Sequence, residues 1–378
     1  FDSPAAGTVA GYSMHGISYC DFWHVTGAST HIDIDNGTVE SAGSSFFNRA
    51  VIRVLCSRGW GILLLANYAR PRGTAFEELL ASAACLAAIT GEEVNLAPAT
   101  GGTLSVPEPV EDPRDVSLEE KTSLLAAIER SAKREQVVNT RGTYAERIEQ
   151  VRFEDSSGSD LSYEICRSGF SVLAVASRNG TIQMGYERQH TIRGLNLRGQ
   201  EEQGRQAAAT AVALLDARAA KGGTMHAVLD PELAGVFAHE AVGHASEGDL
   251  VQQGSSVLGG KTGERIGSDT LTIVDDPTLT EFGFEPFDAE GVAVARTEII
   301  RKGVLSSFLH SRETLAAVGN GTPGHARAMP GEPPVVRMSN TFIENGDATY
   351  EEILGECKNG ILLKGSRGGQ VDPGRGVF

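Results

Sequence analysis

The sequence predicts an α+β protein in which a mixed α/β domain, residues 1–135, precedes a β-rich domain, residues 136–378. The chain has 378 residues, which is more than one hydrophobic core usually takes. It contains 45 glycines but only 6% aromatic residues, a composition typical of sheets joined by tight turns. Helical and strand periodicities alternate in the first domain, whereas strand patterns dominate directly after it.

The first domain is expected to contain a hairpin, two further strands and two helices. Asn36-Gly37 predicts the hairpin because this dipeptide fits the turn between twisted strands. Ser117 predicts the start of the second helix because its side chain can cap the first turn. Three prolines between the helices mark a linker. The expected elements are strands at 31–35, 38–40, 50–56 and 61–65, and helices at 74–89 and 117–134.

The second domain is expected to be built mainly of strands. Alternating or apolar runs between glycine and serine turns predict these strands. A helix is predicted to begin at Pro231, since Asp230 is a good N-cap and proline fits the first helical position. The expected elements are strands at 147–153, 161–167, 171–177, 181–187, 224–229, 271–274, 297–300 and 304–309, and helices at 200–219 and 231–245.

The net charge and the cysteine pattern indicate which binding partners and which cellular compartment to expect. The formal net charge of −16 makes nucleic acid and anionic membrane surfaces poor partners. No apolar run approaches the roughly 20 residues that a membrane-spanning helix needs, and no export signal is visible. The five cysteines are scattered without a CxxC pair, which is typical of a reduced protein. We therefore expect a cytoplasmic protein that binds neither nucleic acid nor membrane.

The predicted helix 231–245 carries the pattern HExxxH at His239, Glu240 and His244. Two metal-binding histidines on one helix face are usually four residues apart, as in HExxH. Here they are five apart, which turns the second ring by about 140° on a regular α-helix. Gly243 could accommodate a kink or a π-bulge that brings His244 back beside His239. The sequence therefore predicts a distorted helix, buried because most of its residues are apolar.

These three residues are candidates for zinc-dependent hydrolysis. His239 and His244 would be Zn²⁺ ligands, and Glu240 would face an activated water and take its proton. A buried histidine is more often a core residue than a ligand, so the pattern by itself leaves a purely structural helix open. Glu240 favours the catalytic interpretation, because a structural site has no use for a free carboxylate beside its first histidine.

Several other residues have weaker patterns. Glu247 and Asp249 follow the second histidine, and either could replace a ligand or orient one. They could equally cap the turn after the helix. His226, in the strand before the helix, is expected to be structural. The glycine-rich turn 365–369 lacks the ending of a phosphate loop, so we expect it to line a substrate or simply to connect two strands.

The segment His239–Asp249, HEAVGHASEGD, resembles the signature of the TldD/PmbA family of metallopeptidases, and the resemblance covers nearly the whole chain. The resemblance implies cleavage of short or unfolded peptides inside a hollow dimer, formed with an identical copy or with a paralogous subunit. It also implies an N-terminal α/β domain, which would supply dimer contacts and chamber wall, and a β-rich, barrel-like domain bearing the metal-site helix. The other matching blocks are Val274–Leu279, Asp288–Gly291, Gly319–Gly321, Arg337–Thr341 and Gly368–Asp372.

The resemblance also implies a third zinc ligand, a cysteine downstream of the block that ends at Asp372. The present sequence stops at Phe378, so we expect a C-terminal segment with this cysteine to lie beyond it. Cys357 precedes the block and does not match the ligand position. Two alternatives to the peptidase stay open from the residues alone. One is a non-catalytic peptide-binding partner subunit with a structural histidine helix, and the other is a metal-dependent amidase for a small molecule.

Overall fold

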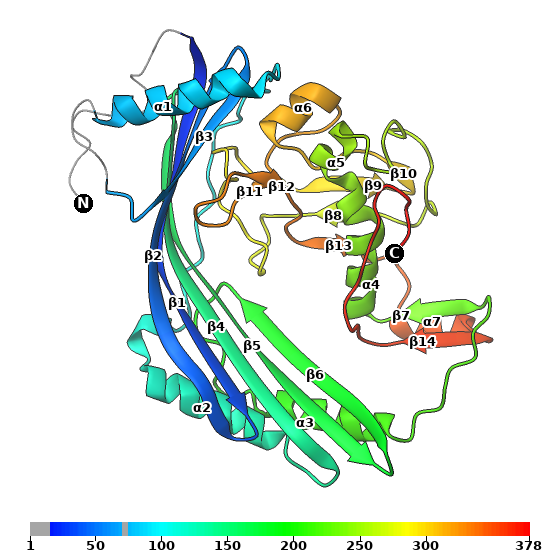
Figure 1. The fold of residues 1–378 in the computed structure, drawn as a ribbon. Helices are drawn as coiled ribbons and strands as arrows, with labels where there is room; N and C mark the ends of the chain where they lie inside the picture. Colours follow the sequence, from blue (N-terminus) through cyan, green and yellow to red (C-terminus); the bar gives the residue numbers. More distant parts are fainter. Residues whose placement is uncertain (1–15, 70–74) are drawn as a thin grey trace.

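A computed structural model describes residues 16–69 and 75–378 as a mixed α+β fold. Its largest element is a six-stranded antiparallel sheet in the order β3-β2-β1-β4-β5-β6 (Figure 1). The predicted absence of an export signal concerns residues 1–15, which lie outside the described part. The strands are β1 Ile17–Asp35, β2 Thr38–Cys56, β3 Gly59–Ala66, β4 Val137–Asp155, β5 Asp160–Arg178 and β6 Thr181–Thr191.

The sheet joins strands from both predicted domains. β4 follows residue 135, yet it pairs with β1 from Asp21↔Asp155 to Asp35↔Arg141. The predicted boundary therefore falls within one continuous sheet, and the division at residue 135 stays a prediction. β3 and β6 lie at opposite edges and do not pair, so the described sheet is open. The barrel-like closure expected from the resemblance is thus not formed by the described strands.

Local turn chemistry determines how the strands of the sheet are connected. Asn36 and Gly37 have φ values of 49° and 81°, which is the left-handed backbone that an Asn-Gly hairpin turn uses. The predicted hairpin is therefore confirmed, although its strands are much longer than the sequence pattern indicated. The predicted strands 161–167 and 171–177 form the single strand β5, because pairing with β4 continues through the residues between them.

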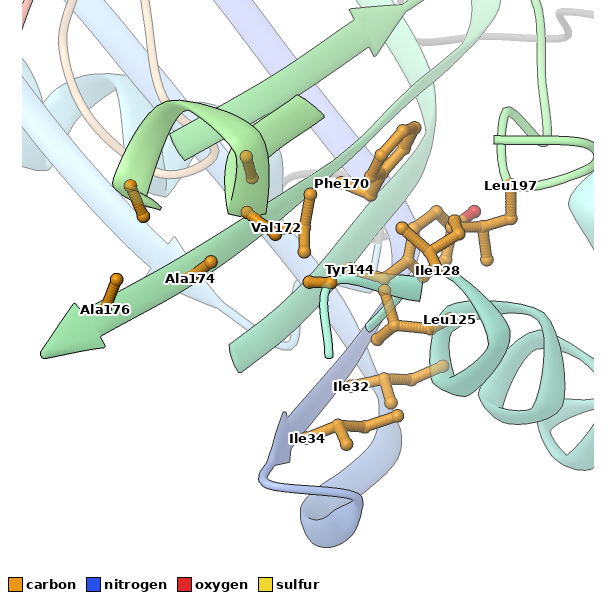
Figure 2. Packing of buried hydrophobic residues seen from close by; sticks show 14 of the residues in the cluster. Ile32, Ile34, Leu125, Ile128, Tyr144, Phe170, Val172, Ala174, Ala176 and Leu197 are labelled. Atoms are coloured by element: carbon orange, nitrogen blue, oxygen red, sulfur yellow. The ribbon is translucent and has the colours of Figure 1, made fainter. Parts of the chain in front are cut away.

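Three helices cover one face of the sheet: α1 Ala75–Thr90, α2 Leu118–Ser131 and α3 Glu201–Leu214. Thr74, the predicted first residue of α1, lies outside the described residues. Ser117 caps α2 as predicted, since its side chain accepts a hydrogen bond from the Glu120 backbone N–H. α3 ends five residues earlier than predicted. Figure 2 shows the core beneath α2 and α3, where Ile32, Tyr144 and Phe170 are almost fully buried.

The opposite face of the sheet packs against the C-terminal half of the chain. Trp23 and Phe153 from the sheet contact Phe287 in an apolar cluster. Beside this cluster, the buried Arg53 guanidinium bonds Asp21 on β1 at 2.5 Å and Glu290 in the C-terminal half at 3.2 Å. An ion pair with so little solvent exposure contributes only while all its partners are present. This network therefore fixes the C-terminal half on the sheet.

The C-terminal half consists of short elements around a second core. A four-stranded sheet runs in the order β10-β9-β8-β13, and two further sheets, β11-β12 and β7-β14, have two strands each. The predicted strand 304–309 is reduced to two residues. Within the described ranges no helix is long and apolar enough to cross a membrane. The elements are β7 His226–Leu229, α4 Pro231–Ala238, α5 Gly248–Gln252, β8 Ile273–Asp275, β9 Thr297–Arg301, β10 Val304–Leu305, α6 Arg312–Val318, β11 Ala326–Arg327, β12 Val335–Val336, β13 Thr341–Ile343, α7 Tyr350–Glu356 and β14 Gly360–Leu363.

Candidate metal centre

The helix that carries the histidines begins regularly and then changes its winding. Asp230 accepts a hydrogen bond from the Leu233 N–H at 2.9 Å, so the predicted cap of α4 is confirmed. At His239 the α-helix gives way to a π-helical turn, η3 His239–Gly243, in which the His244 N–H donates to the His239 carbonyl oxygen. A single turn of this kind adds one residue to the helix. The distortion that the five-residue spacing predicts is therefore present.

The π-turn brings the two imidazole rings together. The ring centroids of His239 and His244 are 4.6 Å apart, with the planes at 82°. One potential ligand atom from each of His239, Glu240 and His244 lies within 4.8 Å of the others. This is the one group of three or more such side chains in residues 16–69 and 75–378. Two imidazoles are donors that suit zinc, and an adjacent carboxylate can accept a proton from an activated water.

Gly243 is needed for packing and not for an unusual backbone angle. Its φ of −55° is open to any residue. A Cβ at this position would collide with the Met338 sulfur, which packs directly on the turn. Met338 lies three residues before β13, so the glycine lets this segment approach the histidines. The sequence pointed to the right residue, but the reason lies in a contact across the site.

The predicted burial of the whole helix is wrong. Only Ala238 is buried in α4, and the Phe237 side chain is 44% exposed. The Phe237 ring contacts the Phe378 ring at 4.8 Å between centroids, at the surface. α4 forms one wall of a cleft, so the apolar residues on its outer side remain partly open to solvent. The following turn is better covered, with Ala245, Ser246 and Glu247 buried.

Glu247 orients the second histidine. Its side chain is 2% exposed, and one carboxylate oxygen lies 3.3 Å from Nδ1 of His244. The other oxygen lies 3.5 Å from a guanidinium nitrogen of Arg337. With Nδ1 engaged, Nε2 of His244 is the nitrogen available to a metal. Asp249 differs from Glu247, because the one hydrogen bond of its side chain among the described residues is accepted from the Leu250 N–H, 2.8 Å away. Glu247 is therefore the acid that orients a histidine.

The two histidines titrate differently because only one has a buried carboxylate partner. The hydrogen bond to Glu247 raises the pKa of His244 above its ordinary value. Burial lowers the pKa of His239, and the neighbouring charge on His244 lowers it further. A lowered pKa keeps the His239 imidazole neutral near pH 7, which is the form that binds a metal.

A cleft of about 760 Å³ opens beside His239 and Glu240. Its walls include the edge strand β13, the glycine-rich turn 365–369 and Arg188 from β6. A Cβ on Gly369 would lie 2.5 Å from the Glu240 carboxylate, so this turn passes directly over the acid. The turn therefore lines the site, one of the two roles expected for it.

Two parts of the cleft are missed by the sequence patterns. Arg188 comes from the six-stranded sheet, and only the long-range packing brings it to the histidines. The second is the segment around Ser339, which is held in place by hydrogen bonds to the fully buried Asp275. The Asp275 carboxylate accepts bonds from the Ser339 N–H at 2.8 Å and from the Thr341 hydroxyl at 2.7 Å. The matching block Arg337–Thr341 was the one signal that could have located this segment.

The remaining candidates lie outside the metal cluster. His226 is exposed at the start of β7, where it pairs with Gly360 of β14. Cys357 follows α7 and is not part of the group of potential ligands. All five cysteines of the chain are free thiols in the structure, and the predicted reduced state stays a prediction.

Family models match most of the chain. Their descriptions are PmbA/TldA metallopeptidase domain 1 for residues 20–88, central domain for 111–215 and C-terminal domain for 222–378. The chain belongs to the PmbA/TldD family. It is 38% identical to a metalloprotease of Archaeoglobus fulgidus, over 95% of this chain and 82% of that protein. It is 36% identical to a metalloprotease of Methanothermobacter thermautotrophicus, over 96% and 80%.

A further relative is similar in sequence over part of the chain, and two solved structures share its fold. A protein of Saccharolobus solfataricus named zinc metalloprotease TldD homolog is 35% identical over 40% of this chain and 34% of its own length. The fold matches TldE from Thermococcus kodakarensis with a TM-score of 0.74, at 18% identity over 94% of this chain and 81% of that chain. A Thermotoga maritima structure matches with a TM-score of 0.79, at 21% identity over 93% and 79%.

Proposed function

We propose that this chain is a zinc-dependent peptidase that hydrolyses short or unfolded peptides. The observation that carries the proposal is the π-turn, which places His239, Glu240 and His244 together in an open cleft. Relatives named metalloproteases, one of them a zinc metalloprotease, support it. A helix kept only for structure would not need a glycine-lined cleft over a half-buried carboxylate.

The donor set fits zinc, with His239 and His244 as the protein ligands in this sequence. His244 would use Nε2, because Glu247 holds its Nδ1. When bound, zinc supplies a Lewis acid that lowers the pKa of water toward neutrality and polarises the scissile carbonyl. The third ligand implied by the family resemblance is a cysteine downstream of Asp372, and it stays an expectation.

Glu240 is the proposed general base. Its carboxylate takes a proton from the attacking water, and the same oxygen can return it to the leaving amine. The turn at Gly369 covers this carboxylate, which limits the water molecules that can reach it. His244, held by Glu247, keeps its ring fixed during these transfers. The residues of the chain thus supply orientation and proton transfer.

An extended peptide can enter along β13. This strand is the last in the order β10-β9-β8-β13, and its residues 341 and 342 line the cleft. A free strand edge binds a peptide through backbone hydrogen bonds, which are independent of the peptide's side chains. Asp275 fixes the edge through Ser339 and Thr341. This arrangement supports broad sequence tolerance, with selection by the extended conformation of the substrate.

We further propose a cytoplasmic dimer, with an identical copy or a paralogous subunit, in which residues 1–135 contribute dimer contacts and the wall of a chamber. Enclosure of the cleft would admit unfolded chains and exclude folded proteins. The unpaired cysteines are in keeping with a reducing compartment.

The test is peptide cleavage by the full-length protein before and after zinc chelation. The proposal predicts that a chelator abolishes cleavage, that added Zn²⁺ restores it, and that size-exclusion chromatography shows the same oligomer throughout. Cleavage that continues at full rate in the metal-free protein would contradict a metallopeptidase. Undiminished peptide binding without any cleavage, with or without Zn²⁺, would instead identify a non-catalytic peptide-binding subunit.

A further inference from the structure

Three large apolar side chains follow one another on the open face of β6. Ile182, Met184 and Tyr186 are 64%, 46% and 50% exposed. We call these three residues the β6 stripe. Alternate residues of a strand point to the same side, so the three share one face of the sheet. Contiguous exposed apolar side chains of this size are typical of binding surfaces.

The β6 stripe faces away from the helix that covers this end of the sheet. Gly185, between Met184 and Tyr186, points to the other side, where a Cβ would collide with the Ala207 carbonyl oxygen of α3. The stripe is widened by β5, whose Val175 and Leu173 lie opposite Met184 and Tyr186 in the register. In Figure 1 this open face of β5 and β6 is turned toward the C-terminal half and carries no helix.

The same face leads to the metal centre. Arg188 is the next residue of β6 on this side, and it lines the cleft together with His239 and Glu240. Its guanidinium also lies 3.7 Å from the Glu232 carboxylate at the start of α4. Arg188 lies six positions after Ile182, which corresponds to roughly 20 Å of extended strand. An extended chain with one end in the cleft could therefore lie along the whole stripe.

The backbone of β6 indicates what kind of ligand fits the stripe. β6 is an edge strand, and among the described strands none pairs with its outer side. A free strand edge beside a row of apolar side chains matches an extended polypeptide with apolar side chains at alternate positions. Neither a small metabolite nor an anionic polymer uses such a combination, and the chain's net charge of −16 disfavours the latter.

We propose that the β6 stripe is a second binding site for the substrate, which holds an apolar, extended segment that continues from the cleft for about six residues. This inference rests on the proposed peptidase function. It adds a preference: unfolded chains that expose apolar residues are selected over polar ones. The residues of the metal centre would not discriminate between apolar and polar residues in this segment.

The test compares pairs of peptides that share one cleavable core and carry a six-residue extension. The extension is attached to the amino end of the core in one pair and to the carboxyl end in the other. Within each pair, one peptide has Leu or Phe at alternate positions of the extension, and the other has Ser there. We expect a KM about tenfold lower for the apolar peptide in the wild type, from burial of two or three side chains. The double variant Met184→Thr/Tyr186→Thr should remove this difference and leave kcat and the KM of the bare core unchanged. Threonine keeps the strand propensity of both positions.

The matched control is Val110→Thr, which removes an apolar group of 79% exposure in the linker, away from the stripe. It should leave both KM values unchanged. Equal KM values for the two peptides in the wild type, or an unchanged difference in the double variant, would overturn the proposal. A change in oligomeric state caused by the double variant would also overturn it, because the stripe would then bind another copy of the chain.

A binding measurement separates this proposal from the proposed function. The labelled apolar peptide is titrated onto Glu240→Gln protein, with and without the stripe substitutions, and fluorescence anisotropy is recorded. Binding that weakens about tenfold on substitution of the stripe supports the second site even if no cleavage is ever detected. A peptide affinity that the stripe substitutions do not change overturns the second site, even if the protein proves to be a peptidase.

Discussion

Glu247→Gln tests how the second histidine is held. The substitution preserves the size of the side chain but removes the negative charge beside Nδ1 of His244. Glu247 is almost completely buried, so solvent cannot replace this charge. Loss of a carboxylate that orients a metal-binding histidine typically weakens metal affinity by about 10- to 100-fold. At about 1.4 kcal/mol per factor of ten, the expected loss is about 1.4 to 2.8 kcal/mol.

The assay is a zinc titration of the full-length protein in competition with a chromophoric chelator at fixed pH. Asp249→Asn is the matched control, because this acid lies two residues further on and bonds the backbone of Leu250, with no bond to either histidine in the described part of the chain. We expect the zinc affinity of the control to equal that of the wild type. If both variants bind zinc like the wild type, or if both lose affinity equally, the assignment of Glu247 as the orienting residue is wrong.

Two further predictions concern the cleft and the connection between the sheet and the C-terminal half. Gly369→Ala should lower kcat for peptide cleavage by at least about tenfold while zinc stays bound, because the added Cβ would lie 2.5 Å from Glu240 and must displace its carboxylate. Arg53→Met should lower the free energy of unfolding by about 3–5 kcal/mol in urea titrations, since it leaves the buried carboxylates of Asp21 and Glu290 without a counter-charge.

Each of these substitutions has a control of the same kind. Ser366→Ala alters the same turn but removes atoms, so cleavage should continue at nearly the wild-type rate. Arg205→Met breaks an exposed pair with Glu202 and should change the stability by less than about 0.5 kcal/mol. A Gly369→Ala enzyme of normal activity would show that the turn does not constrain Glu240. An Arg53→Met protein as stable as the Arg205→Met protein would show that the buried network is dispensable.

Features set by neighbouring residues could be predicted from the sequence. The Asn36-Gly37 turn follows from the positive φ that both residues adopt easily, and the Asp230 cap follows from one side chain and a nearby N–H. The π-turn belongs to the same class. Its prediction needs only two histidines, five residues apart, that must reach one metal. In each case the chemistry that decides the structure is contained in a few consecutive residues.

Features set by contacts between distant segments could not be predicted in this way. The pairing of β1 with β4 joins residues more than 100 positions apart, and no local pattern identifies β4 as the partner. Arg188 lines the cleft because the long-range packing of the sheet places β6 beside α4. The apolar character of Phe237 predicts a core residue. Its side chain nevertheless lies at the surface, because the cleft opens beside its helix.

The central claim is that Glu240 is the base of a two-histidine zinc site and not itself a required ligand. The most direct test measures zinc content and peptide cleavage together, in the full-length wild-type protein and in Glu240→Gln and His239→Ala variants. We predict that Glu240→Gln retains zinc at the wild-type ratio and loses about 10²- to 10⁴-fold in kcat, whereas His239→Ala loses both zinc and activity. A Glu240→Gln protein that keeps its zinc and cleaves peptides at the wild-type rate would contradict the claim.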